Sequence, residues 1–258
     1  MKAQVKILIE GCTNADSVVA TGEERTRPTI TLVKDNDIIM VVDPGTLESQ
    51  QLLVDALRKE NLTVGDIDVV CITHSHIDHY RNIGMFPKAK TLEFYGLWDK
   101  ESVESWSENF SASIKIIHTP GHDNTGITLL VDTNEGVVAI CGDVFWKENH
   151  PEKPQDDAYA LDPQKLQDSR DSILKMADWV IPGHGKMYKT GRTAEKTADT
   201  NIGVPMKKEP RANGKCRKCG NLLGKDRCVC RPRLCFRCCE CGMDCDLCGC
   251  SHKNKSTL

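Results

Sequence analysis

The chain has 258 residues, a formal net charge of −3 and 39% hydrophobic residues, enough to bury a core. This length fits one domain of about 200 residues with a small appendage. No apolar run reaches the roughly 18 residues of a membrane-spanning helix, and the first six residues lead into a strand-like stretch without the apolar region of a signal peptide. We therefore expect an intracellular protein, cytoplasmic or, in a eukaryote, nuclear, with no membrane partner.

Charge and cysteines divide the chain into two parts. Residues 1–204 contain 21 Lys and Arg against 32 Asp and Glu, whereas residues 205–258 contain 13 against 5. Of the 14 cysteines, 11 lie between positions 216 and 250. We therefore predict a main domain at 1–190, a linker at 191–214 and a Cys-rich module at 215–258.

The apolar pattern of the main domain predicts strands and two helices. The predicted strands are 5–10, 29–34, 38–42, 68–73, 91–95, 114–118, 126–132, 136–141 and 179–181. The helices are predicted at 47–61, with Thr46 as N-cap, and at 163–176, where Pro163 opens the helix. Residues 13–27 are predicted to form a loop, and 96–112 show no clear pattern.

One short stretch is dense in metal-binding side chains. His74, His76, Asp78 and His79 follow directly after the apolar run 69–72. Several histidines in a solvated loop add nothing to a core, so a metal is the simplest reason for them. The first two histidines suit one ion and the Asp-His pair suits a second, roughly 3.5 to 4 Å away.

Strand after strand ends at a histidine or an aspartate. His122 closes a Thr-Pro-Gly-His motif, Asp143 a Gly-Asp motif and His184 lies in Pro-Gly-His-Gly, each after a predicted strand. The first hairpin ends likewise at Asp43, in an Asp-Pro-Gly turn. We therefore expect one rim of the domain to receive all these side chains.

These motifs, in this order and tens of residues apart, resemble the metallo-β-lactamase superfamily over residues 5–190. The resemblance implies an α+β fold, a four-layer αββα sandwich, and catalytic roles for Asp78 and Asp143. By this resemblance, His74, His76 and His122 hold one metal, and Asp78, His79 and His184 hold a second. Asp143 bridges the two metals. Asp43 lies outside the coordination shell and orients one of the ligands.

The resemblance also implies a reaction, in which a hydroxide bridging two zinc ions attacks a carbonyl carbon or a phosphorus atom. Asp143 favours the thioesterase, lactonase and nuclease branches over true β-lactamases. His76 favours zinc over the iron of flavodiiron members, and Mn or Fe stays compatible with these ligands. We expect a dinuclear zinc hydrolase, either an endoribonuclease that cleaves RNA phosphodiesters or a thioester or lactone hydrolase of the glyoxalase II type.

The cysteines of the C-terminal module occur in closely spaced pairs. Without a secretory signal, such pairs are metal ligands more often than disulfides, although an iron-sulfur site is an alternative. We predict a zinc-ribbon-like module with one to three structural zinc ions that is unfolded without metal. The predicted ligands are Cys216, Cys219, Cys228, Cys230, Cys235, Cys238, Cys245 and Cys248.

The basic charge of this module favours a phosphate backbone such as RNA as its partner. Zinc-thiolate sites carry negative charge that offsets part of it, so protein docking is the alternative. A different hypothesis is a zinc-finger adaptor with a decayed hydrolase domain, and the presence of all seven ligand positions argues against it. We therefore expect the substrate to be RNA or a small ester or thioester. The sequence is also compatible with a homodimer.

Overall fold

The computed structural model describes residues 2–15 and 23–192. The chain divides into two units, Met1–Lys196 and Thr197–Leu258, and every described residue belongs to the first unit. Apart from residues 191 and 192, the predicted linker and the predicted Cys-rich module with its zinc ligands lie outside the described residues, so they stay predictions. Within the described ranges, no helix is long and apolar enough to cross a membrane.

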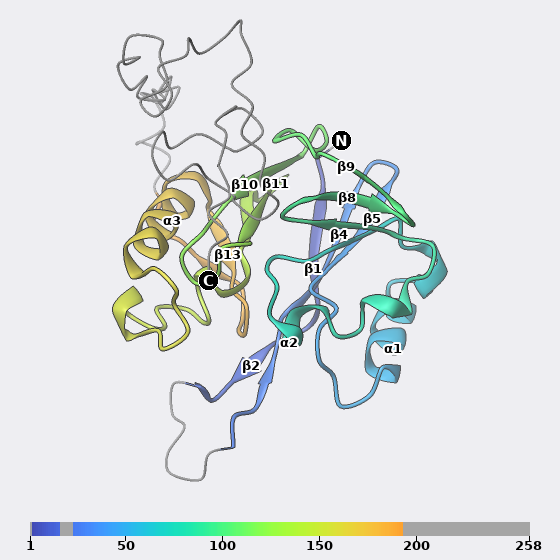
Figure 1. The fold of residues 1–258 in the computed structure, drawn as a ribbon. Helices are drawn as coiled ribbons and strands as arrows, with labels where there is room; N and C mark the ends of the chain where they lie inside the picture. The colour runs from blue at the N-terminus through green and yellow to red at the C-terminus, as the bar shows by residue number, and fades with distance from the viewer. Residues whose placement is uncertain (1, 16–22, 193–258) are drawn as a thin grey trace, which may run out of the picture. The chain divides into compact units, whose positions relative to one another are not determined.

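Seven strands form the first sheet, in the order β1-β4-β5-β6-β7-β8-β9 (Figure 1). The central strands β5, β6 and β7 run parallel, and the other neighbours are antiparallel. The strand bounds are β1 Gln4–Ile9, β4 Ile30–Asp35, β5 Ile38–Val42, β6 Val69–Cys71, β7 Lys90–Glu93, β8 Gly96–Asp99 and β9 Ser102–Glu104.

Five strands form the second sheet, in the order β10-β11-β12-β13-β14. Only β12 and β13 are parallel in it. Its strands are β10 Ile114–His118, β11 Ile127–Thr133, β12 Gly136–Ile140, β13 Trp179–Ile181 and β14 Tyr188–Lys189. A separate two-stranded ribbon pairs β2 Cys12–Thr13 with β3 Thr26–Arg27, and it extends away from the sheets in Figure 1.

Three α-helices complete the described unit: α1 Gln51–Lys59, α2 Ile77–Tyr80 and α3 Pro163–Met176. Short 3-10 turns occupy Val64–Asp66, Ile83–Met85, Gly142–Val144 and Pro154–Asp156. In Figure 1, α1 covers the outer face of the first sheet and α3 the outer face of the second.

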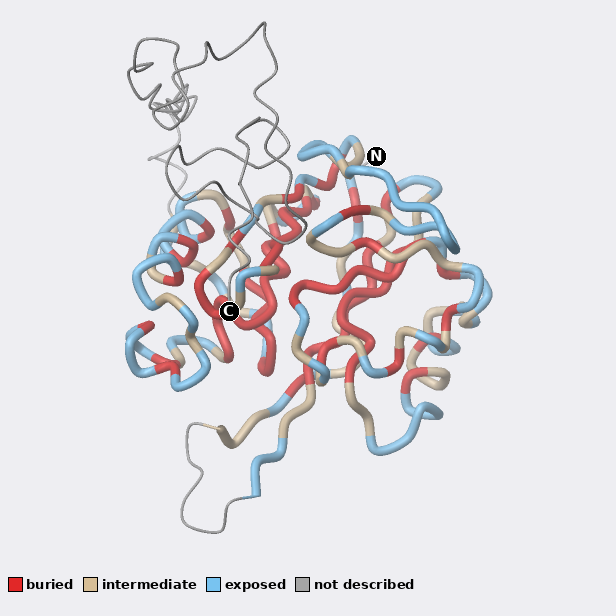
Figure 2. The backbone as a smooth tube through the Cα atoms, in the orientation of Figure 1, coloured by how far each residue is buried: buried red, intermediate tan, exposed pale blue. Residues whose placement is uncertain are grey.

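The two sheets pack face to face because their strands are apolar on both sides. In β4, Val33 joins the core between the sheets, whereas its neighbour Leu32 packs toward α1. In β11, Leu129 faces the same central core and Leu130 faces α3. Successive residues of a strand point to opposite faces, so each strand feeds two cores. Figure 2 shows these strands as buried and the helices as exposed on their outer sides. The structure confirms the αββα sandwich.

The helix predictions have different outcomes. The second is confirmed at its start, where Pro163 is the first helical residue and the Asp162 side chain accepts from Lys165 N at 3.1 Å. The start of the first is wrong, because the helix begins at Gln51 and Thr46 does not cap it. The backbone N–H of Thr46 donates instead to Asp78 O at 2.7 Å, which ties this segment to the His-rich loop.

Two regions contain strands that the sequence pattern did not reveal. Residues 13–27, predicted as a loop, carry part of the β2–β3 ribbon, and 96–112 contribute β8 and β9. These strands are short, between two and four residues. β9 is exposed along its whole length and the ribbon residues are not buried, so the alternation of apolar and polar residues that marks a half-buried strand is absent.

Candidate metal centre

Parallel strand direction brings the candidate ligands to one end of the sandwich. β5 and β6 are parallel, so Asp43 and the 73–79 loop leave the first sheet at the same edge. β12 and β13 are parallel as well, which places Asp143 beside His184. β10 is antiparallel to β11, which is antiparallel to β12, so His122 also follows a strand that ends at this edge.

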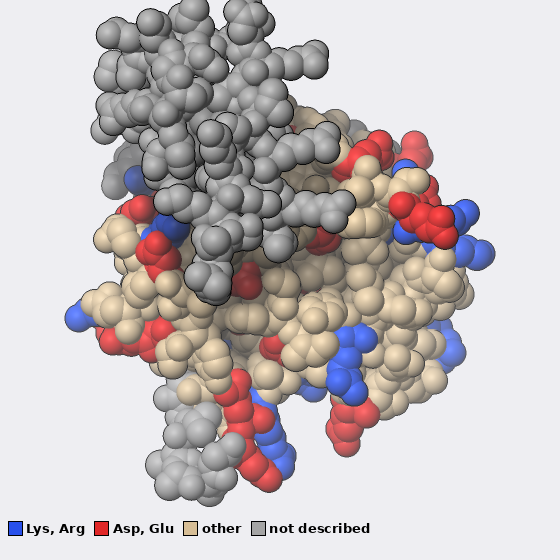
Figure 3. Space-filling view, viewed as in Figure 1, with Lys and Arg blue, Asp and Glu red and all other residues tan. Residues whose placement is uncertain are grey.

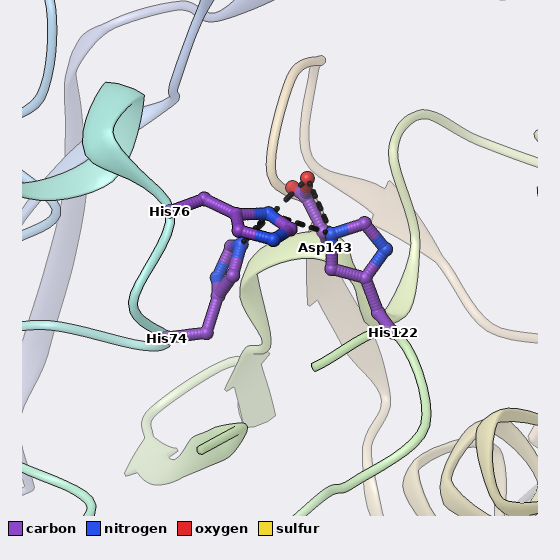
Figure 4. A group of neighbouring side chains, drawn as sticks. All are labelled: His74, His76, His122 and Asp143. Carbon is purple, nitrogen blue, oxygen red and sulfur yellow. Dashed lines mark hydrogen bonds and ion pairs between the residues drawn. The ribbon is translucent and has the colours of Figure 1, made fainter. Parts of the chain in front are cut away.

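The first group of ligands consists of His74, His76, His122 and Asp143 (Figure 4). His76 Nδ1 lies 3.1 Å from His74 Nε2 and 3.1 Å from His122 Nε2. Asp143 Oδ2 lies 3.4 Å from His122 Nε2 and 3.9 Å from His74 Nε2. Nitrogens bound tetrahedrally to zinc would be about 3.3 Å apart, which follows from a Zn–N bond of about 2.0–2.1 Å.

The second group consists of Asp78, His79 and His184, and the other oxygen of Asp143 faces it. Asp143 Oδ1 lies 3.3 Å from His79 Nε2 and 3.1 Å from His184 Nε2. Asp78 Oδ2 lies 3.7 Å from His79 Nε2 and 3.6 Å from His184 Nε2. His184 Nε2 also lies 3.2 Å from Asp143 Oδ2. The Asp143 carboxylate thus lies between the two groups, as a bridging carboxylate does, with Oδ1 toward His79 and Oδ2 toward His122.

Asp43 lies outside both groups and orients two histidines. Its Oδ2 accepts from His79 Nδ1 at 2.8 Å and from Thr73 Oγ1 at 2.6 Å. Since the Thr73 hydroxyl proton is used in this way, its oxygen accepts from His74 Nδ1 at 3.1 Å. Both histidines then carry their proton on Nδ1 and turn the Nε2 lone pair toward the group.

His122 and His184 are oriented by the same principle. His122 Nδ1 donates to Asp157 Oδ2 at 3.0 Å, and the Asp157 side chain is fully buried. His184 Nδ1 donates to the Arg27 carbonyl at 2.9 Å. Sequence reasoning missed Asp157 because it is one of several acids in the segment 145–162, and nothing in their spacing distinguishes it.

Three positions at this site have a backbone conformation or a close contact that few residue types tolerate. Asp43 has a φ of +50°, a left-handed conformation that Asp adopts more readily than most residues. Gly142 has a φ of +51°. A Cβ on Gly183 would lie 1.8 Å from Asp143 Oδ1, so glycine lets the 182–185 turn approach the bridging carboxylate.

The electrostatics favour a cation. Burial would raise the pKa of Asp143, but His184 and His79 outweigh burial and hold it well below its usual range. Burial, followed by the neighbouring His79, lowers the pKa of His74, and burial followed by His122 lowers that of His76. Burial opposes protonation of His79, yet Asp143 and Asp43 raise its pKa, so a cation competes with a proton there.

Two buried polar atoms among the described residues have no hydrogen-bond partner at this site, His79 Nε2 and Asp143 Oδ1. Such atoms are costly unless they bind something. Both face the interior of the second group, and the donors around them are imidazole nitrogens and carboxylate oxygens, which suit zinc. The residues present therefore fit a pair of divalent ions.

A pocket of about 310 Å³ opens above the ligands. His76, His122, Asp143 and His184 line its floor. The β2–β3 ribbon, helix α2 and the segment 145–162 form its walls. The catalytic metals of a hydrolase would thus face a space the size of a small organic molecule.

Sequence comparison identifies relatives of the chain. Residues 25–101 match the model of the metallo-beta-lactamase superfamily. A Xenopus laevis protein named Metallo-beta-lactamase domain-containing protein 1 is 31% identical over 184 residues, covering 67% of this chain and 78% of the relative. The Rattus norvegicus protein of the same name is 32% identical, over 62% of this chain and 66% of the relative. A Caenorhabditis elegans protein is 26% identical, over 66% of this chain and 51% of the relative.

Solved structures share the fold. A Thermotoga maritima protein assigned as a metallo-beta-lactamase superposes with a TM-score of 0.59 at 22% identity, over 73% of this chain and all of that protein. The dizinc quorum-quenching lactonase AidC superposes with a TM-score of 0.51 at 16% identity, over 67% of this chain and 78% of AidC. With this fold, with the two ligand groups around Asp143 and with the Xenopus relative matched over most of its length, the chain belongs to the metallo-beta-lactamase superfamily.

Proposed function

We propose that this metal-dependent hydrolase binds two zinc ions, one in each ligand group, and cleaves small carboxylic esters, thioesters or lactones. The observation that carries the proposal is the buried Asp143, with one oxygen facing each group at the floor of a pocket of about 310 Å³. The lactonase AidC, which has the same fold, is a dizinc enzyme and offers a precedent.

Hydrolysis adds the oxygen of water to the carbonyl carbon, breaks the bond from that carbon to the leaving oxygen or sulfur, and delivers a proton to the leaving atom. Two zinc ions would lower the pKa of a coordinated water molecule toward about 7 and polarise the carbonyl group. The residues of this chain position those ions and move the proton.

Asp78 is the residue to which we assign proton transfer. Both Asp78 and Asp143 line the pocket, but the Asp78 side chain is 15% exposed and the Asp143 side chain 7%. Thr26 Oγ1 of the ribbon donates to Asp78 Oδ2 at 3.2 Å, which restricts the orientation of the carboxylate. A carboxylate held in this way can take a proton from water and return it to the leaving group.

The lining of the pocket favours a small acyl compound over RNA. Among the described residues, no Lys or Arg lines it, although a polyanion requires positive charge along its path. On the visible face of the described unit, basic side chains occur in small separated groups rather than in a band (Figure 3). An endoribonuclease activity is the second candidate, and the basic residues 205–258, which lie outside the described part, favour it.

A panel of substrates tests the proposal on the purified, zinc-loaded full-length chain: a neutral acyl thioester, an acyl lactone and a single-stranded RNA. We expect turnover of the thioester or the lactone. His76→Ala should lower kcat by more than about 100-fold, because loss even of a residue that only supports a ligand costs 10- to 100-fold. The His76→Ala variant should also contain less zinc per protein than the wild type, measured by mass spectrometry.

His118→Ala is the matched control. His118 is exposed, its ring packs between Phe94 and Trp106 with ring centroids 4.9 Å apart in both pairs, and it belongs to neither ligand group. We expect wild-type zinc content and activity from it. If the wild type with two zinc ions cleaved only RNA, the endoribonuclease would replace the small-molecule hydrolase. If it cleaved none of the three, the proposal would be wrong.

A further inference from the structure

The pocket wall that rises above the metal ligands combines a carboxylate with two aromatic rings. Glu24 lies just before β3 on the ribbon, and Trp146 and Tyr159 belong to the segment 145–162. All three line the pocket. The Tyr159 hydroxyl donates a hydrogen bond to Glu24 Oε2, so the ribbon and the 145–162 segment meet at this wall.

The two rings lie close to each other and differ in exposure. Their centroids are 5.9 Å apart with the planes tilted by 50°. Trp146 is 4% exposed and Tyr159 is 46% exposed, so packing fixes the Trp146 side chain whereas the Tyr159 side chain is accessible to solvent. The hydrogen bond to Glu24, with smaller contributions from burial and from the charge of Glu24, raises the pKa of Tyr159, which keeps its hydroxyl protonated as the donor.

No basic side chain balances Glu24 among the described residues that line the pocket. Arg25, the sequence neighbour of Glu24, pairs with Glu23 at 3.5 Å. Two more basic residues close by in sequence contact backbone carbonyls of the ribbon region. Lys147 Nζ lies 3.5 Å from Thr13 O, and Arg27 Nη2 donates to Glu10 O at 3.1 Å. The wall therefore presents negative charge and aromatic faces, the two features by which proteins bind ammonium groups.

We propose that this wall selects substrates whose non-reacting end carries an ammonium or quaternary ammonium group, held by Glu24, Tyr159 and Trp146. The inference rests on the proposed hydrolase function and names the substrate class of the same pocket. Because the pocket is small, about 310 Å³, the charged group and the scissile carbonyl must belong to one compact molecule. A carboxylate-bearing substrate of equal size meets Glu24 unfavourably.

Three thioesters with the same acetyl group test this on the zinc-loaded full-length chain: S-acetylthiocholine, its neutral isostere S-(3,3-dimethylbutyl) thioacetate, and S-acetyl-3-mercaptopropionate. We expect kcat/KM to fall in this order. The Glu24→Gln variant should reduce the preference for the choline thioester over its isostere by about three- to tenfold, the size expected for one charge at a partly solvated site.

Glu23→Gln is the matched control. Glu23 is the adjacent exposed carboxylate, pairs with Arg25 at 3.5 Å and does not line the pocket. It should leave the preference unchanged. Equal kcat/KM for the cationic and neutral thioesters in wild type, or the same ratio in both variants, would overturn the inference while the hydrolase function stands.

Calorimetric titration with butyltrimethylammonium separates the two proposals, because it needs no turnover. We expect binding to wild type and to Glu23→Gln, and at least about threefold weaker binding to Glu24→Gln. Absence of binding to wild type, or equal binding to all three proteins, would refute the selection of ammonium groups. Binding without hydrolysis of any thioester would instead count against the hydrolase.

Discussion

Replacing Asp43 by Asn tests the contacts that orient the metal ligands. Asp43 accepts hydrogen bonds from Thr73 N at 2.8 Å, Thr73 Oγ1 at 2.6 Å and His79 Nδ1 at 2.8 Å. Asn has the same shape and tolerates the φ of +50° at this position. The substitution therefore isolates the loss of a charged acceptor.

The loss of stability and of zinc affinity expected for Asp43→Asn follows from these contacts. However the amide turns, its NH₂ group faces at least one of the three donors. A buried donor without a partner costs about 1–3 kcal/mol, and exchanging charged for neutral hydrogen bonds costs about 1 kcal/mol more. We expect the unfolding free energy of the metal-free protein to fall by about 2–4 kcal/mol. Since His79 and His74 lose their fixed orientation, zinc affinity should fall by about 10- to 100-fold.

Urea unfolding and zinc competition against a chromophoric chelator measure the two effects. Asp35→Asn is the control, because Asp35 is also buried and accepts side-chain hydrogen bonds from Ser111 and Asn36. It pairs with Ile38 at the end of the β4–β5 hairpin farthest from the site. It should lower stability without weakening zinc binding. Wild-type zinc affinity in Asp43→Asn would refute the orienting role.

Three further outcomes follow from the site. Gly183→Ala places a Cβ 1.8 Å from Asp143 Oδ1 and should displace the bridging carboxylate, so zinc affinity should fall at least about tenfold, whereas Gly84→Ala, with nothing within 4 Å, should not change it. Asp157→Asn weakens the acceptor that orients His122 and should lower zinc affinity by about 10- to 100-fold in the same chelator assay. Zinc at about 100 times its dissociation constant should stabilise the folded protein by about 2.7 kcal/mol relative to the chelated protein, which thermal unfolding would detect. Equal unfolding temperatures with and without zinc would show that the ligand groups hold no ion.

Much of the fold and the order of the ligands could be predicted from the sequence. Strands such as Ile114–His118 and Trp179–Ile181 are apolar runs bounded by turn residues, and the structure confirms both to the residue. The seven ligand positions could be found because each follows such a strand. The structure brings all seven into the two groups, and the assignment of a metal to each group remains a proposal.

Other features depend on partners that are distant in the chain and have no local signal. Asp157 lies 35 residues from His122, and a buried carboxylate that orients a ligand has the same local sequence as any solvated acid. Thr46 looks like a helix cap, but its N–H is taken by Asp78 O, 32 residues away in the chain. The ribbon was missed because its strands are too short and too exposed for a periodic pattern.

The sequence by itself determined most strands of the two sheets and the seven candidate ligands, because apolar runs and the polar residues that follow them are encoded in neighbouring positions. The αββα architecture was implied by the resemblance of these motifs to the metallo-β-lactamase superfamily. Only the tertiary structure decided which oxygen of Asp143 faces which group, which acceptor holds each histidine, and that Glu24 meets Tyr159 above the ligands. These depend on how segments 35 to 135 residues apart, such as His122 and Asp157 or Glu24 and Tyr159, approach one another in space, and no local pattern encodes that approach.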